Sequence, residues 1–356
     1  MTIDLQQFEG RKREHIRHAL DPANQASGLS GLDSIRLVHE ALPDLNFEDI
    51  SIEALCLGRA ARTPFYVAGM TAGHAAAADL NLMLARACEA RGWAMGVGSQ
   101  RRELEEGGTT SNSTDKWVEL RRAAPHLVLV ANLGISQIIR APIEAIQRLV
   151  DSIRADALAI HLNALQEVMQ PEGTPQFRGA LSAINRVCKA LSVPVVIKET
   201  GCGFSARTLG RLREAGIAAV DVSGLGGTHW GRIEGARAAA ESLHAQAART
   251  FATWGESTVD SVLAARAALP GTEIWASGGV RSGLDAAKLI ALGAQRVGYA
   301  KPALEAALAG EKQLHDWMER QEFELKTALF CTGSASPAEL AASARAQIKI
   351  PETSWK

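Results

Sequence analysis

One pattern recurs eight times along the chain: a short apolar run, a polar cluster and then a stretch with helical periodicity. The apolar runs occupy residues 65–70, 93–98, 127–134, 157–162, 195–201, 217–224, 274–279 and 296–300. Continuous apolar runs of this length are typical of parallel strands that are covered on both faces. Eight such strands alternating with helices predict an α/β fold, a closed TIM (β/α)8 barrel.

A doubly wound open sheet is the alternative architecture. It normally carries a G-x-G-x-x-G fingerprint after its first strand, and "GMTAGH" at residues 69–74 does not match it. The barrel is therefore favoured. The segments between strands read as amphipathic helices, and the helix predicted over residues 175–192 is an example. Its apolar residues recur at spacings of three and four, at Phe177, Leu181, Ile184, Cys188 and Leu191.

Two segments fall outside the repeat. Residues 1–62 form an N-terminal extension to a barrel over residues 63–356, with a helix expected over 32–42 and a strand over 50–58 that caps the barrel floor. Residues 225–257 form a loop after the sixth strand that is far longer than the usual ~2–6 residues. This loop is interpreted either as a lid or as an ordered insertion with a helix near 234–249, and both can hold together.

Composition limits the possible partners and compartments. The chain has 356 residues, 47% of them hydrophobic, and a formal net charge of −1, which argues against broad electrostatic binding of nucleic acid. The five cysteines are scattered without a C-x-x-C motif, which suits a reducing compartment and gives no zinc signature. The polar N-terminus does not read as a signal peptide, and no apolar run reaches the ~18 residues that span a membrane. A soluble, cytoplasmic protein is expected.

Polar or small residues follow every predicted strand, at the end where barrel enzymes carry their sites. Alone, Asn132 reads as a backbone-bonding amide and His161 as a satisfied core histidine. Lys198 is harder to explain this way, because a buried ammonium needs an anionic or electron-rich partner. Glu199 is the structural candidate for that partner. The coincidence of all eight strand ends predicts a functional site.

The last two strand ends resemble a phosphate site. "ASGGVRSG" follows the seventh strand and "GYAKP" follows the eighth, and such loops offer backbone N–H groups to a phosphate. The glycines at 278 and 279 allow close backbone approach. With Lys198 and the Gly-rich "GLGGTHW", these loops indicate a phosphorylated cofactor, of which FMN is the common case. A sugar-phosphate substrate remains the alternative.

Four motifs together resemble type 2 isopentenyl diphosphate isomerase, an FMN-dependent barrel enzyme. They are R-K-x-E-H at residues 11–15, "GSQR" at 98–101, "HLNALQE" at 161–167 with "QPEG" at 170–173, and "KETGCGFS" at 198–205. The resemblance extends over nearly the whole chain. One departure is visible, since the M-T-G-G of the family reads Met70-Thr71-Ala72-Gly73 here and adds a methyl group where backbone approaches the flavin.

The resemblance implies an isomerase of isoprenoid biosynthesis that interconverts isopentenyl and dimethylallyl diphosphate. It implies reduced FMN as the acid–base group, NADPH as reductant, Mg²⁺ on the diphosphate, and a homo-oligomer that binds neither nucleic acid nor membrane. The implied cofactor contacts are Met70, Thr71, Ala72, Ser99, Asn132, Lys198, Ser223, Thr228, Gly278, Gly279, Arg281, Ala300 and Lys301. The implied substrate contacts are Arg11, Lys12, Ser99, Gln100, Arg101, His161, Asn163 and Gln166, with Gln166 catalytic and Glu167 on the metal.

Two other functions stay open at this point. An FMN oxidoreductase acting on a small hydroxy acid would need a His–Arg pair at the strand ends. A sensor that merely binds a phosphorylated ligand would be colourless when purified and would not interconvert isomers. The basic run "GRKREH" by itself reads as a solvated arm, and only the resemblance makes it a substrate clamp.

Overall fold

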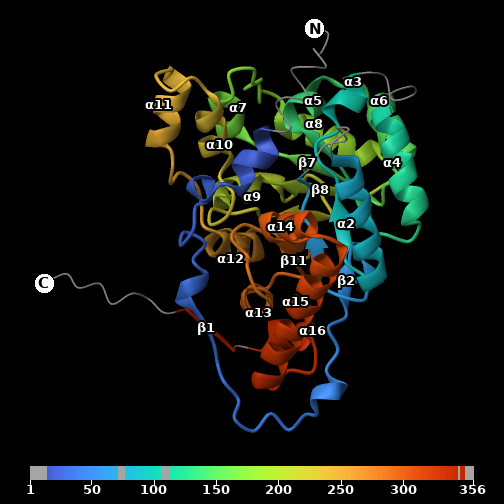
Figure 1. The fold of residues 1–356 in the computed structure, drawn as a ribbon, viewed down its shortest axis with the longest axis vertical. Coiled ribbons are helices and arrows are strands. Elements are labelled where there is room, and N and C mark those ends of the chain that lie inside the picture. The colour runs from blue at the N-terminus through green and yellow to red at the C-terminus, as the bar shows by residue number, and fades with distance from the viewer. Residues whose placement is uncertain (1–13, 71–76, 106–111, 344, 349–356) are drawn as a thin grey trace, which may run out of the picture.

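The computed structural model describes residues 14–70, 77–105, 112–343 and 345–348. Eight parallel strands close into a barrel in the order β10-β11-β4-β5-β6-β7-β8-β9, which confirms the predicted fold (Figure 1). All eight coincide with the apolar runs read from the sequence. The strands are β4 (Phe65–Val67), β5 (Ala94–Gly96), β6 (Leu129–Gly134), β7 (Ala157–His161), β8 (Val195–Lys198), β9 (Ala219–Asp221), β10 (Glu273–Ala276) and β11 (Arg296–Tyr299).

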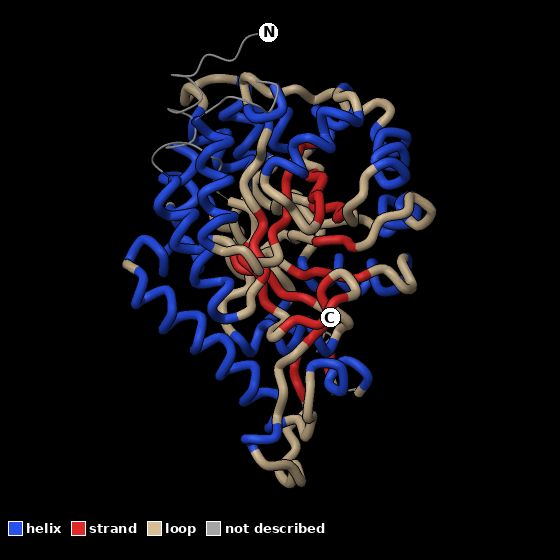
Figure 2. Tube along the Cα trace, turned by 90° about the vertical axis from the view of Figure 1, so that its right-hand side faces the viewer, coloured by secondary structure: helices blue, strands red, loops and turns tan. Residues whose placement is uncertain are grey.

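Helices surround these strands on the outside of the barrel (Figure 2). Residues 14–20 are also helical. The named helices are α2 (Ala78–Arg91), α3 (Arg101–Glu105), α4 (Asn112–Ala123), α5 (Ile135–Arg140), α6 (Ile143–Ser152), α7 (Ala164–Met169), α8 (Ala180–Ala190), α9 (Ala206–Leu212), α10 (Trp230–Arg237), α11 (Leu243–Thr250), α12 (Thr258–Ala268), α13 (Gly283–Ala291), α14 (Lys301–Ala309), α15 (Glu311–Cys331) and α16 (Pro337–Ala342). No helix in the described part of the chain combines the length and apolarity that crossing a membrane requires.

Helix α8 is shorter than the sequence pattern predicts. Gly179 precedes it in a left-handed conformation with φ of 87°, so the expected helix over residues 175–192 begins only at Ala180. Ile184 and Val187 on its inner face are buried against the barrel. The apolar stripe was therefore correctly identified, but it continues into the loop on the N-terminal side.

The two faces of each barrel strand are both apolar, as the continuous runs require. One set of side chains packs inside the barrel, and small residues such as Ala94, Ala157, Ala159 and Ala219 leave room there for Trp275. The other set packs under the helices in the main core. Burial of this surface is the dominant stabilising contribution to the barrel.

A hairpin closes the barrel floor, as expected from residues 50–58. Strand β2 (Ala54–Cys56) pairs with β3 (Arg59–Ala61), and Cys56 is buried with the side chains inside the barrel. The buried guanidinium of Arg296 donates to the Leu55 carbonyl at 3.2 Å, and the Leu57 N–H donates to Glu273 Oε2 at 2.7 Å. Any cavity inside the barrel can therefore open only at the end opposite to this hairpin.

The helix expected over residues 32–42 is wrong. A 3-10 turn at Leu32–Ser34 leads into strand β1 (Ile35–Leu37), which pairs antiparallel with β12 (Ala346–Ile348) near the other end of the chain. Within β1, Ile35 is buried and Arg36 is exposed, which is the period of a strand. Tertiary pairing has overridden a pattern that is also compatible with a helix.

The long connection after β9 is an ordered insertion. It contains helices α10 and α11 in place of the helix expected near 234–249, and α10 packs against α7. The alternative role as a moving lid stays a prediction.

Candidate functional site

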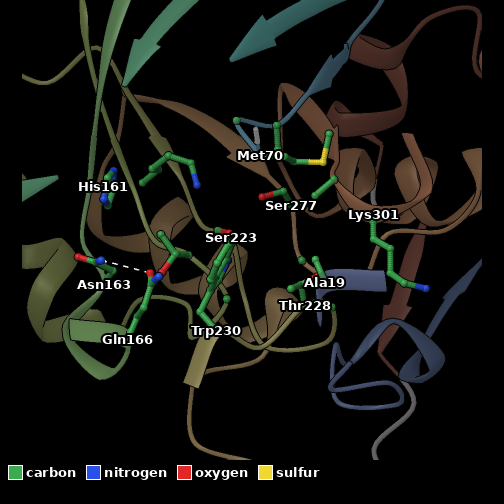
Figure 3. A pocket seen from close by; sticks show the side chains of 18 of the residues that line it. Ala19, Met70, His161, Asn163, Gln166, Ser223, Thr228, Trp230, Ser277 and Lys301 are labelled. Carbon is green, nitrogen blue, oxygen red and sulfur yellow. Dashed lines mark hydrogen bonds between the residues drawn. The ribbon is translucent and has the colours of Figure 1, made fainter. Parts of the chain in front are cut away.

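A cavity opens at the C-terminal ends of the barrel strands (Figure 3). The predicted residues that line it are Met70, Ser99, Arg101, Asn132, His161, Asn163, Gln166, Glu167, Lys198, Ser223, Thr228, Gly278, Gly279, Arg281, Ala300 and Lys301. Arg11, Lys12, Thr71 and Ala72 lie outside the described residues. Residues scattered over the whole chain thus converge on one surface because parallel strands present the same end to it.

Gln100 is not among the described residues that line this cavity, and its expected contact with substrate stays a prediction. Its side chain is 1% exposed, and its Oε1 accepts a hydrogen bond from the Asn132 N–H at 3.2 Å. The Gln100 N–H donates in turn to the Asn132 carbonyl at 2.9 Å. Gln100 therefore ties the loop after β5 to β6 and fixes Asn132.

Asn132 and His161 form a hydrogen-bonded pair on the cavity wall. Asn132 Nδ2 donates to the Val97 carbonyl at 3.0 Å, which leaves Oδ1 as the acceptor facing His161 Nδ1 at 2.9 Å. The proton of a neutral His161 then lies on Nδ1, and Nε2 is the acceptor atom. Both residues have structural partners, yet both remain part of the cavity surface.

Lys198 finds its anionic partner on the neighbouring strand. The ammonium donates to the Glu199 carbonyl at 2.7 Å and lies 3.8 Å from Asp221 Oδ2. Asp221 also accepts from the Ser277 hydroxyl at 2.8 Å and from the N–H of Ser223, whose φ of 38° is a strained backbone conformation. The buried carboxylate of Asp221 therefore compensates for a cation that the cavity needs.

The Glu199 carboxylate faces backbone groups and not Lys198. It accepts N–H groups of Thr200 at 2.6 Å and Gly201 at 2.8 Å, together with that of Cys202. Burial raises the pKa of Glu199 to about 7, although these N–H groups oppose the shift. Its role is to hold the turn after β8. The expectation that the Glu199 carboxylate is the structural partner of Lys198 is therefore wrong, because Asp221 takes that place.

The "HLNALQE" segment runs from the last residue of β7 into the first turn of α7. Asn163 Nδ2 donates to Gln166 Oε1 at 3.2 Å and to Glu167 Oε1 at 3.0 Å, and Glu167 Oε2 accepts from the Thr174 N–H. Gln166 Nε2 donates to Glu234 Oε1 at 3.1 Å. The Gln166 amide is thus held from both sides while its side chain reaches the cavity (Figure 3).

Sequence reasoning missed Glu234, which is fully buried behind Gln166. His15 Nε2 lies 3.0 Å from Glu234 Oε1, and Arg237 pairs with Glu234 on its other side. Burial by itself raises the pKa of Glu234, but the hydrogen bond and charge of His15, with Arg237 and Gln166, lower it to about 2. The only sequence signal for this cluster was His15, the last residue of the R-K-x-E-H motif.

Arg237 connects three segments at this side of the cavity. Besides Glu234, it pairs with Glu14 at 3.1 Å and with Glu172 of the "QPEG" segment at 3.2 Å. His15 packs edge-on against Trp230, with ring centroids 5.1 Å apart, and both rings line the cavity. The helical residues 14–20, called the N-terminal helix from here on, are therefore part of the site wall.

Glu234→Gln is expected to lower the free energy of unfolding by about 3 kcal/mol near pH 7, because Arg237 and His15 lose the buried carboxylate with which they pair. Since the folded-state pKa of Glu234 lies below its usual value of 4.5, its stabilisation is present above pH 4.5 and is lost as the pH falls toward 2. Chemical denaturation of both proteins across this range should show the difference shrinking. Asp316→Asn, in an exposed ion pair on α15, is the control and should change stability by less than about 1 kcal/mol. A pH-independent difference would contradict the assignment.

Close backbone packing shapes the opposite end of the cavity. Gly278 and Gly279 adopt φ of 103° and 77°, and a Cβ at Gly278 would lie 2.1 Å from the Gly224 carbonyl oxygen. Arg281 and Lys301 line the same end, where helix α14 begins. Two cations, a helix N-terminus and glycine backbone at the cavity surface are features that bind a phosphate.

No group of three or more His, Cys, Asp or Glu suited to hold a metal ion occurs among the described residues. Glu167 is the one carboxylate side chain among the described residues that line the cavity. A metal here would need most of its ligands from water or from a bound molecule, as Mg²⁺ commonly does with phosphates.

Comparison with known proteins agrees with this arrangement. The family model of FMN-dependent dehydrogenases matches residues 18–156 and 158–347. The isopentenyl-diphosphate delta-isomerase of Legionella pneumophila (strain Corby) is 54% identical over 94% of this chain and 96% of that protein. The protein of the same name from Bdellovibrio bacteriovorus is 52% identical over 94% and 96%.

Solved structures resemble the fold at much lower identity. A mandelate oxidase bound to 3,3-difluoro-2-hydroxy-3-phenylpropionic acid superposes with a TM-score of 0.66 at 19% identity, over 98% of this chain and 100% of that one. Another, with a monooxide FMN adduct, gives 0.64 at 20% identity over 93% and 91%. These show the barrel fold alone. By its sequence, the chain belongs to the FMN-dependent dehydrogenase family and, within it, to the isopentenyl-diphosphate delta-isomerases.

Proposed function

We propose that this protein interconverts isopentenyl and dimethylallyl diphosphate in isoprenoid biosynthesis, with reduced FMN and Mg²⁺ in its cavity. The observation that carries the proposal is the character of the cavity wall. Amides, hydroxyls and cations line it, and Glu167 is the single described carboxylate there. The reaction moves a proton on and off carbon without net redox change, yet the described part of the wall offers no other carboxylic acid for that task.

The residues present fit FMN. The glycine backbone at 278 and 279, with Arg281 and Lys301, suits the phosphate, while Met70, Ser99, Asn132, Lys198, Ser223 and Thr228 line the space beside it. Thr71 and Ala72 are proposed as further contacts, although they lie outside the described residues. When bound in its reduced form, FMN supplies the acid–base group that the wall lacks.

Gln166 is proposed as the residue that acts on the reacting end of the substrate. Asn163 and Glu234 hold its amide from two sides, so its orientation is fixed before substrate binds. An amide is a poor base, but it can hold the substrate by donating or accepting a hydrogen bond. The barrel interior and the floor hairpin exclude water from below, which a reaction on an unactivated alkene requires.

The diphosphate is proposed to bind at the rim beside α7. His161, Asn163, Ser99 and Arg101 line this region, and Glu167 is placed to hold Mg²⁺ together with phosphate oxygens. Arg11 and Lys12, which precede the described helix, are proposed to complete the charge compensation.

Several further assignments rest on the family resemblance. We propose NADPH as the source of electrons for FMN, a homo-oligomeric state, a cytoplasmic location and a division into an extension over 1–62 and a barrel over 63–356. A lid movement of residues 225–257 is proposed as well, because α10 carries Trp230 on the cavity wall.

One experiment separates this function from its alternatives. Purified protein with FMN is given isopentenyl diphosphate or a small 2-hydroxy acid such as mandelate or lactate. Formation of dimethylallyl diphosphate without oxidation of the hydroxy acid supports the isomerase. Stoichiometric oxidation of the hydroxy acid would instead establish the oxidoreductase, and colourless protein without either reaction would favour a phosphate-ligand sensor.

A further inference from the structure

One buried amide joins three segments at the phosphate end of the cavity. Gln25 follows the short 3-10 helix Pro22–Asn24 and is 7% exposed. Its Nε2 donates to the Ala19 carbonyl at 2.9 Å and to Thr228 Oγ1 at 3.2 Å. Its Oε1 accepts from Arg281 Nη2 at 3.3 Å. The N-terminal helix, the loop after β9 and the loop after β10 therefore meet at a single side chain.

The backbone around Gln25 is fixed by its own contacts. Gln25 forms an isolated β-bridge with Thr228, and the Ala26 N–H donates to the Gly227 carbonyl at 2.7 Å. Arg232 Nη1 donates to the Gln25 carbonyl at 2.7 Å. These bonds fix the backbone at Gln25, so its side-chain amide can hold Thr228 and Arg281 in place.

Gln25 acts through its neighbours, because it does not itself line the cavity. Ala19, Thr228 and Arg281 do line it, and Figure 3 shows the first two beside each other. The Arg281 guanidinium makes its side-chain hydrogen bonds to neutral acceptors, the Gln25 amide and the Val280 carbonyl at 3.1 Å. Among the described residues it forms no ion pair, although the carboxylates of Glu305 and Asp285 act on its charge from farther away, so its side chain is held in place and can still meet an anion.

We propose that Gln25 is a positioning residue that sets Arg281 and Thr228 for the FMN phosphate and couples phosphate binding to docking of the N-terminal helix. That helix carries His15, which reaches Glu234 at the substrate end of the cavity. Phosphate binding at one end of the cavity thereby stabilises the cavity wall at the substrate end. The inference rests on the proposed function, since it takes the phosphate at this end to be that of FMN.

The test compares FMN with riboflavin, which has the same ring system but no phosphate. Apoprotein is titrated with each flavin, and the two dissociation constants are measured by fluorescence quenching. Gln25→Ala is expected to weaken FMN binding by about tenfold and to leave riboflavin binding within about twofold. A merely structural loss would weaken the binding of both flavins alike and would overturn the inference. An unchanged dissociation constant for FMN would also overturn it.

Gln25→Met guards against a packing artefact, because it keeps the side-chain length but removes both polar atoms. It is expected to reproduce the selective loss of FMN affinity. Gln246→Ala, an exposed glutamine on α11, is the matched control and should change neither constant. In the Arg281→Ala background, Gln25→Met should weaken FMN binding clearly less than tenfold, since one of the two residues through which it acts is gone. A full additional tenfold loss there would contradict action through Arg281.

Limited trypsin cleavage after Arg17 reports on the docking of the N-terminal helix. In the unmodified protein, saturating FMN is expected to slow this cleavage severalfold. In Gln25→Met, saturating FMN should slow it by a smaller factor. Equal protection in both would overturn the coupling. If the unmodified protein binds no FMN, the proposed function fails. If it binds FMN with the Gln25 variants unaltered, only the present inference fails.

Discussion

Gln166→Ala is expected to lower kcat by about 100-fold or more while raising KM by a smaller factor. Gln166 is held by Asn163 and by the buried Glu234, so its amide meets the substrate in a fixed orientation. Loss of a positioned group that assists proton movement typically costs about 10²–10⁴-fold in rate. A change mainly in kcat would show that the contact matters most in the transition state.

The measurement requires steady-state kinetics together with FMN occupancy and the melting temperature. Gln147→Ala is the control, because Gln147 is a partly exposed glutamine on α6 that does not line the cavity. It should leave all three quantities unchanged. A Gln166→Ala protein that melts much earlier but keeps a normal kcat would reduce the residue to a cap of the strand end.

Glu167→Gln should have the second large effect, on magnesium. The substitution keeps the size of the side chain but removes its charge, and Mg²⁺ relies on carboxylate and phosphate oxygens. The Mg²⁺ concentration for half-maximal activity is expected to rise on the order of 10–100-fold, with kcat/KM for the diphosphate falling in parallel. FMN affinity should stay unchanged, since the phosphate end lies across the cavity.

Glu172→Gln is the control for Glu167, because Glu172 belongs to the adjacent "QPEG" segment and is directed to Arg237. It should leave the magnesium dependence near that of the unmodified protein. If the two variants behave alike, or if activity is independent of Mg²⁺ in the unmodified protein, Glu167 is not the metal ligand.

The barrel was predictable because each strand carries its own signal. Runs such as residues 127–134 and 157–162 are apolar throughout, which is characteristic of a strand buried on both faces. Most of the site followed from the same logic, since side chains at the C-terminal ends of parallel strands must converge. Asn132, His161 and Lys198 therefore line one cavity, as expected.

The features that were predicted wrongly or missed share one physical cause, namely contacts between distant parts of the chain. The segment 32–42 became partly a strand because β12, more than half the chain away, pairs with it. The cluster of His15, Glu234 and Arg237 assembles only when the N-terminal helix meets α10, and no local spacing records that meeting.

The most direct test of the central claim is the rate of isomer interconversion as a function of the flavin's redox state. FMN-loaded protein is assayed anaerobically with isopentenyl diphosphate and Mg²⁺, either fully oxidised or reduced by NADPH or a chemical reductant. We expect dimethylallyl diphosphate only from the reduced protein, with far less than one NADPH consumed per product. Equal rates from oxidised or flavin-free protein would contradict the account.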